Sequence, residues 1–344
     1  MGKIAINGFG RIGRVAFRIL YERGLHKNIV AVNDLTDAAN LAYLLKYDSN
    51  YGVLPADVKG VVVENRAPVT GEISVDDHTF SVTSVKEPQE LPWKDLGVDV
   101  VIESTGRFTD EIGMRKHIAA GAKRVILSAP VKDDTVTTVV RGVNEDALGD
   151  QELVSNASCT TNCITPVAAV IEEKFGIEKA MMTTIHSYTA SQAIQDAPNK
   201  DYREGRAAAQ NMVPTSTGAT KAAAKALPAL QGIFLGLSVR VPTAVGSLAD
   251  FTFVTKKDTS VEEVKAVLQE AGRQAKYKGI LEVTEDQIVL TDIVGNPASA
   301  IVDLSLTQVV GGNLVKVVAW YDNEWGYANR LVDQVVAMAG LGKE

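Results

Sequence analysis

The sequence predicts an α/β protein of two domains, the first built on a parallel sheet and the second of α+β type with a mostly antiparallel or mixed sheet. Three observations carry this prediction. The chain has 344 residues, which is longer than one hydrophobic core usually serves. Strand and helix patterns alternate over its first half, whereas long β-rich runs with few helices dominate from about residue 176 onward.

The alternation in the first half is regular enough to place each element. Short apolar runs predict buried strands, and apolar residues at helical spacing predict the helices between them. The expected strands are 3–7, 29–34, 98–105 and 124–130, and the expected helices are 11–24, 37–48 and 111–122. This order implies a parallel sheet with helices on both faces. The segment 60–93 differs, because its short strands and intervening turn residues predict a small antiparallel insertion.

The second half is dominated by strands, and its clearest helix is at 261–275. The β-rich runs are 181–188, 234–242, 247–255, 299–310 and 314–322. The last segment, 324–340, is helical again, with Leu331, Val332 and Val335 on one apolar face. A mostly antiparallel or mixed sheet with helices on one side fits this pattern.

Composition excludes several classes of protein. Hydrophobic residues make up 46% of the chain and charged residues 22%, as in globular proteins. The net charge of −7 gives no electrostatic support to bulk nucleic-acid binding. No apolar run reaches bilayer length, and the start MGKIAINGFGR does not continue as a secretory apolar segment. We therefore expect a cytoplasmic protein that binds neither nucleic acid nor membrane.

The stretch NGFGRIGR places Gly8, Gly10 and Gly13 at G-x-G-x-x-G spacing, after an expected strand and at the start of an expected helix. An acidic residue, Asp34, ends the next strand, about 20 residues further on, as the dinucleotide fingerprint requires. Gly8 would permit the tight turn, Gly10 the approach of a pyrophosphate, and Gly13 close packing of the helix. These residues predict a Rossmann-type cofactor domain in which Asp34 accepts hydrogen bonds from a ribose, as suits NAD.

Both cysteines of the chain, Cys159 and Cys163, lie in SNASCTTNC. The apolar spacing that follows predicts a helix beginning at Cys159, with Cys163 one turn inside. A thiol at a helix start is close to the positive end of the helix dipole, which lowers its pKa and makes it the better nucleophile.

Three other interpretations of the two cysteines remain open at this point. A C-x₃-C pair could bind a metal, but a structural zinc site needs four ligands and the chain has only four histidines. A disulfide across one helical turn is unfavourable in the cytoplasm. Two packed thiols would be the default, and the polar residues beside Cys159 argue against it. We expect no metal site.

A nucleophilic thiol needs a base, and the histidines are its candidates. His186 ends the β-rich run MMTTIHSY, a position at which strands carry catalytic groups. His26, His78 and His117 are more simply explained as surface residues. His186 is therefore the expected partner of Cys159.

Six motifs taken together resemble one family. They are GFGRIGR, SNASCTTNC, TTIHSYTA, PTSTGATKA, SVRVPT and WYDNEWGYANR, in this order and at these spacings. The chain resembles the phosphorylating glyceraldehyde-3-phosphate dehydrogenases over essentially all of residues 2 to 340. The resemblance implies a homotetramer in which the loop 187–210 reaches across a subunit interface.

The resemblance also implies domain limits and site residues. An NAD-binding domain would span 1–157, with the C-terminal helix 324–344 packed back on it, and a catalytic domain would span 158–323. Cys159 matches the nucleophile and His186 the base. The residues that match cofactor contacts are Gly8, Gly10, Arg11, Ile12, Gly13, Asp34, Ser128 and Asn323, with Lys86 as a looser match. The residues that match phosphate contacts are Ser158, Thr160, Thr217 and Gly218 for inorganic phosphate, Thr189 and Arg240 for the substrate phosphate, and Arg206 nearby.

The implied reaction is the NAD-dependent oxidative phosphorylation of D-glyceraldehyde 3-phosphate to 1,3-bisphosphoglycerate, in glycolysis or gluconeogenesis. Cys159 would form a thiohemiacetal and then a thioester, which inorganic phosphate cleaves. The basic residues near the site are expected at the catalytic end and not at the adenosine end, so that NAD is preferred over NADP.

The chain departs from the family pattern at a few positions. Arg107 lies where the family more often has an apolar residue, and Ala244 replaces a common second proline. Ser191 stands where some members carry Asp, and Glu204 where some carry Arg, which leaves Arg203 and Arg206 as the nearby cations.

Three rival functions can be separated by experiment. The nearest is oxidation of erythrose 4-phosphate without efficient phosphorolysis. A cofactor-bound redox sensor that uses oxidation of Cys159 would form no NADH with aldehyde and phosphate. A metal-binding module would carry bound zinc.

Overall fold

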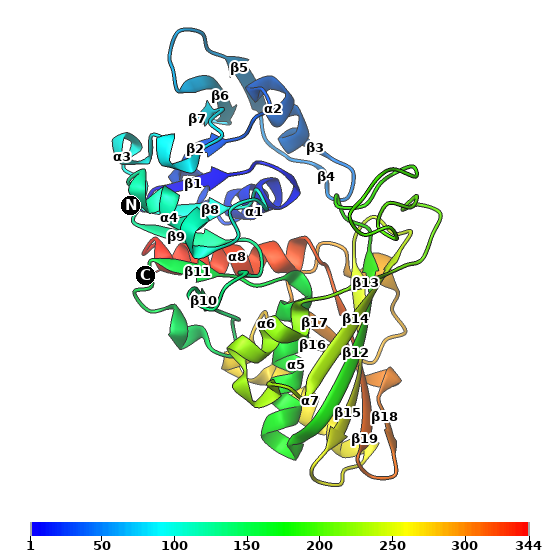
Figure 1. Ribbon diagram of the computed structural model, residues 1–344. Helices are drawn as coiled ribbons and strands as arrows, with labels where there is room; N and C mark the ends of the chain where they lie inside the picture. Colours follow the sequence, from blue (N-terminus) through cyan, green and yellow to red (C-terminus); the bar gives the residue numbers. More distant parts are fainter. Residues whose placement is uncertain (1, 343–344) are drawn as a thin grey trace. The chain divides into compact units, whose positions relative to one another are not determined.

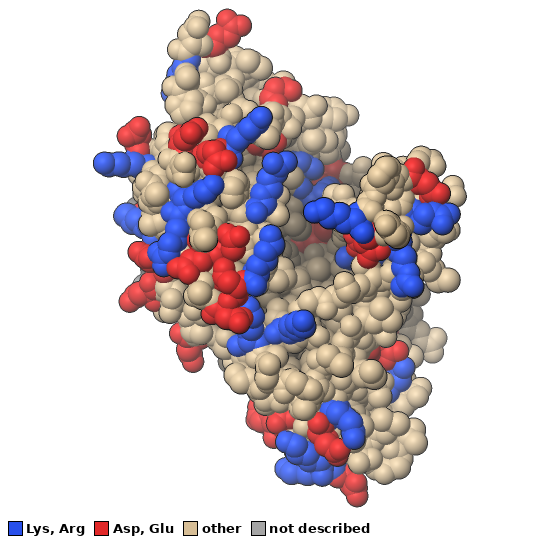
Figure 2. Space-filling view, viewed as in Figure 1, with Lys and Arg blue, Asp and Glu red and all other residues tan. Residues whose placement is uncertain are grey.

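The computed structural model describes residues 2–342, and the chain folds as two compact units. The first unit holds the residues up to 139, residues 146–157 and the segment from 328 onward; the second holds 140–145 and 158–327. Over the face drawn in Figure 2, Lys and Arg side chains are interspersed with Asp and Glu, as the small net charge of −7 leads one to expect.

The first unit is built on a nine-stranded sheet of order β10-β11-β9-β8-β1-β2-β7-β6-β5 (Figure 1). The predicted central strands are confirmed as β1 (Ile4–Asn7), β2 (Ile29–Asn33), β8 (Val100–Glu103) and β9 (Arg124–Leu127). They pair in parallel, and every residue of β1 and β8 is buried, because helices cover both faces of such a sheet.

The remaining elements of the first unit follow the predicted order, with shorter bounds. The helices are α1 (Arg11–Glu22), α2 (Ala38–Lys46), the short α3 (Trp93–Leu96), α4 (Glu111–Ala119) and most of α8 (Trp325–Met338). The outer strands are β10 (Thr137–Thr138) and β11 (Leu153–Ser155), and β3 (Tyr47–Asp48) and β4 (Gly52–Val53) form a separate two-stranded sheet. The segment from 328 onward packs within this unit, where Gln334 Nε2 donates to Asn156 Oδ1 at 2.7 Å.

The small antiparallel insertion predicted for the segment 60–93 is confirmed, whereas the surface positions expected for two histidines are wrong. The strands of this insertion are β5 (Val58–Val62), β6 (Val69–Val75) and β7 (His78–Thr83). They are antiparallel to one another, but β7 pairs in parallel with β2, so that they extend the main sheet. His26 and His117 are buried and not on the surface, because both pack among aromatic side chains.

The second unit contains an eight-stranded mixed sheet, as predicted. Its order is β13-β14-β12-β15-β19-β17-β16, with β18 paired to β19. The strands are β12 (Ile177–Ser187), β13 (Val213–Ser216), β14 (Phe234–Val241), β15 (Ser247–Thr255), β16 (Leu281–Thr284), β17 (Ala300–Asp303), β18 (Gln308–Val310) and β19 (Leu314–Tyr321). The expected continuous run 299–310 is broken at Asp303, whose carboxylate accepts from the Ser305 N–H and starts a helical turn.

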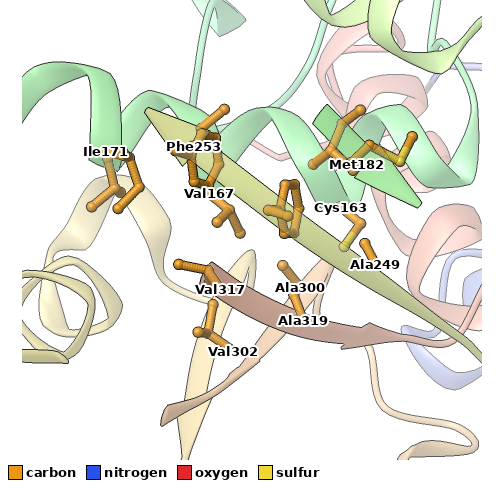
Figure 3. Close-up of a cluster of buried hydrophobic side chains, with 14 of the residues drawn as sticks. Cys163, Val167, Ile171, Met182, Ala249, Phe253, Ala300, Val302, Val317 and Ala319 are labelled. Carbon is orange, nitrogen blue, oxygen red and sulfur yellow. The ribbon is translucent and has the colours of Figure 1, made fainter. Parts of the chain in front are cut away.

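Three helices pack on this sheet in Figure 1: α5 (Cys159–Phe175), α6 (Ala219–Ala226) and α7 (Val261–Arg273). Their apolar residues and the inward residues of the strands form one core, part of which Figure 3 shows around Cys163, Val167 and Met182. Ser260 and Glu263 form a capping box that starts α7.

Candidate active site

The glycine-rich turn lies where the strand order of the first sheet reverses, because β1 has β2 on one side and β8 on the other. Ligands of open α/β sheets bind at this point. A Cβ on Gly13 would meet the Gly8 carbonyl oxygen at 2.3 Å, and Gly8 has a φ of +90°, so both positions need glycine. A Cβ on Gly10 would meet nothing within 4 Å, which leaves open space over the first N–H groups of α1, as a bound pyrophosphate requires.

A cavity of about 250 Å³ opens at this turn. Its lining residues are Asn7, Gly8, Gly10, Asn33, Asp34, Leu35, Val85, Lys86, Ser104, Thr105, Arg107 and Phe108. The Asp34 carboxylate is fixed by two backbone N–H groups, of Phe9 at 2.9 Å and of Thr36 at 3.0 Å. The cavity and the open cradle above Gly10 fit a dinucleotide such as NAD.

Lys86 and Arg107 line the same cavity as Asp34 and Leu35. The expectation that basic residues belong only to the catalytic end is therefore wrong. The departure at Arg107 adds a cation to the wall of this cavity, and its own backbone N–H is fixed by Thr105 Oγ1 at 3.1 Å.

Other residues that match cofactor contacts are placed differently. Arg11 and Ile12 start helix α1, but the Arg11 guanidinium pairs with Asp48 at 2.5 Å. Ser128 follows β9, and its hydroxyl is buried without a hydrogen-bond partner among the described atoms. Asn323 belongs to the second unit, where its Oδ1 accepts from the Gly246 N–H at 2.8 Å.

In the second unit, helix α5 begins at Cys159, as predicted. Ser158 is its N-cap, and the Ser158 hydroxyl accepts from the Thr161 N–H at 3.0 Å. Small polar residues favour this position because their oxygen atoms satisfy the free N–H groups of the first turn. The Cys159 thiol is thereby held at the positive end of a helix of 17 residues.

His186 lies near the end of β12, with its Nε2 atom 3.4 Å from Cys159 Sγ. Its Nδ1 atom is 2.7 Å from the Ser187 carbonyl oxygen. A carbonyl only accepts, so Nδ1 carries the proton of the neutral ring and Nε2 presents a lone pair to the thiol. This is the arrangement that a general base needs.

Burial affects the protonation of both groups. It raises the pKa of the Cys159 thiol, against smaller opposing effects of Arg240 and the Thr160 hydroxyl. It also lowers the pKa of His186 to about 3, with Arg240 as the second cause. The helix start is expected to lower the pKa of the Cys159 thiol. Desolvation outweighs that effect, and the pKa is raised. Transfer of the proton from Sγ to Nε2 would create a thiolate and an imidazolium in contact. The attraction between these two charges makes the titrations of the two groups depend on each other.

Cys163 has a different environment one turn further along α5. It is fully buried (0% exposed) beside Ala249 and Met182 (Figure 3), and burial raises its thiol pKa well above the ordinary value. Both thiols are free. Within residues 2–342, a base lies within reach of Cys159 and not of Cys163.

Arg240 on β14 lies opposite His186 in the register of the neighbouring strand β12. One of its terminal nitrogens donates to the Ser187 carbonyl at 3.4 Å, while its Nε is buried without a partner among the described atoms. A guanidinium with unused donors suits a bidentate anion. Thr189 follows this strand end, and its Oγ1 lies 3.1 Å from Ser191 Oγ.

Thr217 and Gly218 form the start of α6. Gly218 is the N-cap, and it offers no side-chain acceptor to the first N–H groups of the helix, although Thr217 Oγ1 accepts from the Ala219 N–H at 3.2 Å. A helix start of this kind favours an anion.

Three residues that match phosphate contacts are engaged elsewhere. Ser158 caps α5, and Thr160 Oγ1 lies 2.9 Å from the buried Tyr321 hydroxyl. Arg206 donates from Nε to Asp196 at 3.0 Å. Glu204, at the departure from the family pattern, accepts from Thr215 Oγ1 at 3.2 Å and so ties the loop to β13.

Sequence reasoning missed Tyr321. Its hydroxyl lies between Thr160 Oγ1 (2.9 Å) and Thr184 Oγ1 (2.8 Å), and its ring packs edge-on against His186. Burial raises the pKa of this phenol, so it stays protonated and can donate. The motif WYDNEWGY contains Tyr321, but no local pattern shows that it reaches a strand so distant in the chain.

A dinucleotide-type cavity in one unit and a thiol facing an imidazole base in the other define a class: the two-domain, nucleotide-dependent dehydrogenases. Residues 2–111 match the family model of the glyceraldehyde 3-phosphate dehydrogenase NAD binding domain, and residues 158–323 match that of the C-terminal domain. The chain belongs to the glyceraldehyde-3-phosphate dehydrogenase family, and its first unit contains the NAD binding domain.

Bacterial relatives match almost the whole chain. A glyceraldehyde-3-phosphate dehydrogenase of Streptomyces coelicolor is 50% identical over 97% of this chain and 97% of its own. Glyceraldehyde-3-phosphate dehydrogenase 1 of Bacillus cereus is 49% identical over 99% of this chain and all of its own (100%). The enzyme of Borreliella burgdorferi is 50% identical over 96% of this chain and 98% of its own.

Two features are absent from residues 2–342, the part of the chain that the structure describes. No helix within it is long and apolar enough to cross a membrane. Within the same residues, no group of three or more His, Cys, Asp or Glu side chains could hold a metal ion.

Proposed function

We propose that the protein catalyses the NAD-dependent oxidation and phosphorylation of D-glyceraldehyde 3-phosphate to 1,3-bisphosphoglycerate, in glycolysis or gluconeogenesis. The observation that carries this proposal is the pair formed by Cys159 and His186, with 3.4 Å between Sγ and Nε2. Membership of the family and the names of its relatives support the substrate.

In the first half-reaction, Cys159 loses its proton to His186, its sulfur attacks the aldehyde carbon, and the protonated His186 returns the proton to the carbonyl oxygen. A thiohemiacetal and a neutral imidazole result. The resulting thiohemiacetal hydroxyl gives its proton to Nε2 as the carbon is oxidised, and general base catalysis of this kind contributes about 10²–10⁴-fold. The Cys159 N–H at the start of α5 is a donor for the oxyanion. When bound, NAD supplies the acceptor for the hydride that the carbon loses. The sulfur is left in a thioester.

In the second half-reaction, an oxygen of inorganic phosphate attacks the thioester carbon. The C–S bond breaks, the acyl phosphate leaves and the Cys159 thiolate is restored. Two phosphate groups must be held. The unused donors of Arg240 and the hydroxyl of Thr189 suit the substrate phosphate, and the open helix start at Thr217 and Gly218 suits inorganic phosphate. Arg206 could join them only by leaving Asp196.

The experiment is the absorbance of NADH with glyceraldehyde 3-phosphate, with and without inorganic phosphate. We expect sustained turnover only when phosphate is present, because the thioester otherwise remains on Cys159. Faster turnover with erythrose 4-phosphate that does not depend on phosphate would favour the nearest rival. No NADH with either aldehyde would favour a redox sensor.

The functional domains that we propose are 1–157 together with the helix 324–344 for the cofactor, and 158–323 for catalysis. The start of α5 at Cys159 supports the boundary at 157/158. Expression of residues 158–323 alone would test whether the catalytic part folds independently.

We also propose a cytoplasmic homotetramer. One face of the second sheet is apolar and open: Met181 (67% exposed) on β12 lies opposite Leu235 (60% exposed) on β14. Tyr202 and Ile194 in the loop 187–210 are also exposed, and surfaces of this kind indicate an interface between copies. Light scattering that gives the mass of a monomer would contradict the assembly.

A further inference from the structure

A chain of buried polar side chains lies under the cavity of the first unit, and none of the steps above uses it. Its members come from β1, β2, β8, α3 and α4. They are Trp93, His117, Glu103, Asn7 and Asn33, all between 0% and 5% exposed. We call them the floor network.

The hydrogen bonds of the floor network have a fixed direction at one end. Trp93 Nε1 donates to His117 Nδ1 at 3.0 Å. An indole N–H can only donate, so Nδ1 accepts and the proton of the neutral ring is on Nε2. Nε2 then donates to Glu103 Oε2 at 3.0 Å. Both ring nitrogens of His117 therefore already have a hydrogen-bond partner, Trp93 for Nδ1 and Glu103 for Nε2.

From Glu103 the floor network reaches one wall of the cavity. The Glu103 carboxylate accepts from Asn7 Nδ2 at 2.6 Å and from the Thr105 N–H at 2.8 Å. Both Asn7 and Thr105 line the cavity. The ring of Phe108, another lining residue, meets the His117 ring edge-on with 6.4 Å between centroids.

The floor network also reaches the opposite wall. Asn33 Nδ2 donates to Asn7 Oδ1 at 2.7 Å and to the Val85 carbonyl at 2.9 Å. Asn33 Oδ1 accepts from the Val85 N–H at 2.9 Å, so one amide clamps the segment that carries Lys86. The walls at Thr105 and at Val85 are thus joined through side chains and not only through the sheet.

We propose that His117 and Glu103 are positioning residues of the cofactor site, which hold the two walls of the cavity at the spacing that the nucleotide needs. The inference rests on the proposed use of NAD at this cavity. Satisfied buried networks are rigid, and a preformed site binds more tightly because less ordering is needed on binding. Removal of the His117 donor leaves a buried carboxylate with an unmatched acceptor, and the walls shift to satisfy it.

The test compares three variants of the full-length protein by calorimetric titration with NAD. His117→Phe should raise the Kd for NAD by roughly tenfold or more. His117→Gln should restore most of the affinity, because a glutamine can accept from Trp93 through Oε1 and donate to Glu103 through Nε2. The matched control is His26→Phe, since His26 is also buried in this unit but its ring nitrogens have no hydrogen-bond partner among the described atoms.

Further readouts separate positioning from stability. For His117→Phe, kcat at saturating NAD and alkylation of Cys159 without NAD should stay near the wild-type values. Trp93→Phe, which removes only the first donor, provides a milder variant if His117→Phe does not fold. An unchanged Kd in folded His117→Phe or Trp93→Phe, or an equal rise in His26→Phe, would overturn the inference. Failure of the wild-type protein to bind NAD would instead overturn the proposed function.

Discussion

The two units each bury a histidine beside a functional region, and the two rings are used in opposite ways. His186 is 3% exposed and His117 is 0% exposed, so burial does not distinguish them. His186 Nδ1 faces a carbonyl, which leaves a lone pair on Nε2 for the Cys159 thiol. His117 Nδ1 faces an indole N–H, which places the proton on Nε2 and commits it to Glu103.

The difference teaches that the partner of Nδ1 decides what a buried histidine can do. An acceptor there makes the far nitrogen a base, and a donor there makes it a fixed hydrogen-bond donor. The catalytic unit therefore contains a proton that can move, whereas the floor network of the cofactor unit contains hydrogen bonds with fixed directions. The predictions below concern substitutions in the catalytic unit first and then in the cofactor unit.

The largest effect is expected from the thiol that faces the free lone pair. Cys159→Ser should lower aldehyde oxidation by several orders of magnitude, because a hydroxyl is a far weaker nucleophile, while NAD binding survives. Cys163→Ser should keep substantial activity and lose about 1–3 kcal/mol of stability, since it buries a hydroxyl in an apolar core. NADH absorbance and thermal unfolding measure the two effects. Equal loss of activity in two folded variants would contradict the assignment.

The second largest effect is expected from the loss of His186, whose Nε2 accepts the proton of the Cys159 thiol. His186→Asn should slow oxidation by about 10²–10⁴-fold. It should also move the pH profile of Cys159 alkylation upward. In the wild type the thiolate forms by transfer of the proton to Nε2, and the positive charge of the imidazolium stabilises it. In the variant the thiolate must form against the pKa that burial has raised.

The control for this prediction is His117→Gln, which leaves the thiol and its base in place. Its alkylation profile should match that of the wild type, since His117 lies in the other unit. An unchanged profile in His186→Asn would show that the imidazole is not the partner of Cys159.

The third prediction concerns Arg240 in the catalytic unit, which lies next to His186 and has unused hydrogen-bond donors. Arg240→Ala should weaken binding of the phosphorylated aldehyde far more than that of unphosphorylated glyceraldehyde. A lost charge-assisted hydrogen bond costs about 1.5–3 kcal/mol, or roughly one to two decades in KM. The same loss with both aldehydes would make Arg240 a structural residue.

The parts that sequence predicted well are those fixed by local chemistry. The glycine turn and the start of α5 depend on neighbouring residues, and the βα alternation depends on short-range periodicity, so each could be placed before the fold was known. Contacts between distant segments could not. Tyr321 on β19 meets Thr160 on α5, and His117 on α4 meets Glu103 on β8, so neither contact leaves a pattern in the nearby sequence. Lys86 and Arg107 share a cavity for the same reason.

The smallest effect concerns the choice between NAD and NADP. We expect Asp34, in the cofactor unit, to control it. The Asp34 carboxylate is held by the Phe9 and Thr36 N–H groups, and a 2′-phosphate of NADP beside it would meet a like charge. NAD should therefore be preferred by at least about tenfold in kcat/KM, or about 1.4 kcal/mol.

Asp34→Ala should narrow this preference chiefly by improving NADP, because Lys86 and Arg107 then remain in the cavity without the opposing carboxylate. The Cys159 alkylation profile should not change, since the proton site lies in the other unit. Asp34→Asn is the matched control: it removes the charge but keeps one oxygen for the two N–H groups, so a gain in NADP use shared by both variants assigns the preference to charge. Adding Arg107→Ala to Asp34→Ala should then reverse part of the gain. A wild-type protein that uses both cofactors equally, or an Asp34→Ala variant that keeps its full preference, would show that this carboxylate does not select the cofactor.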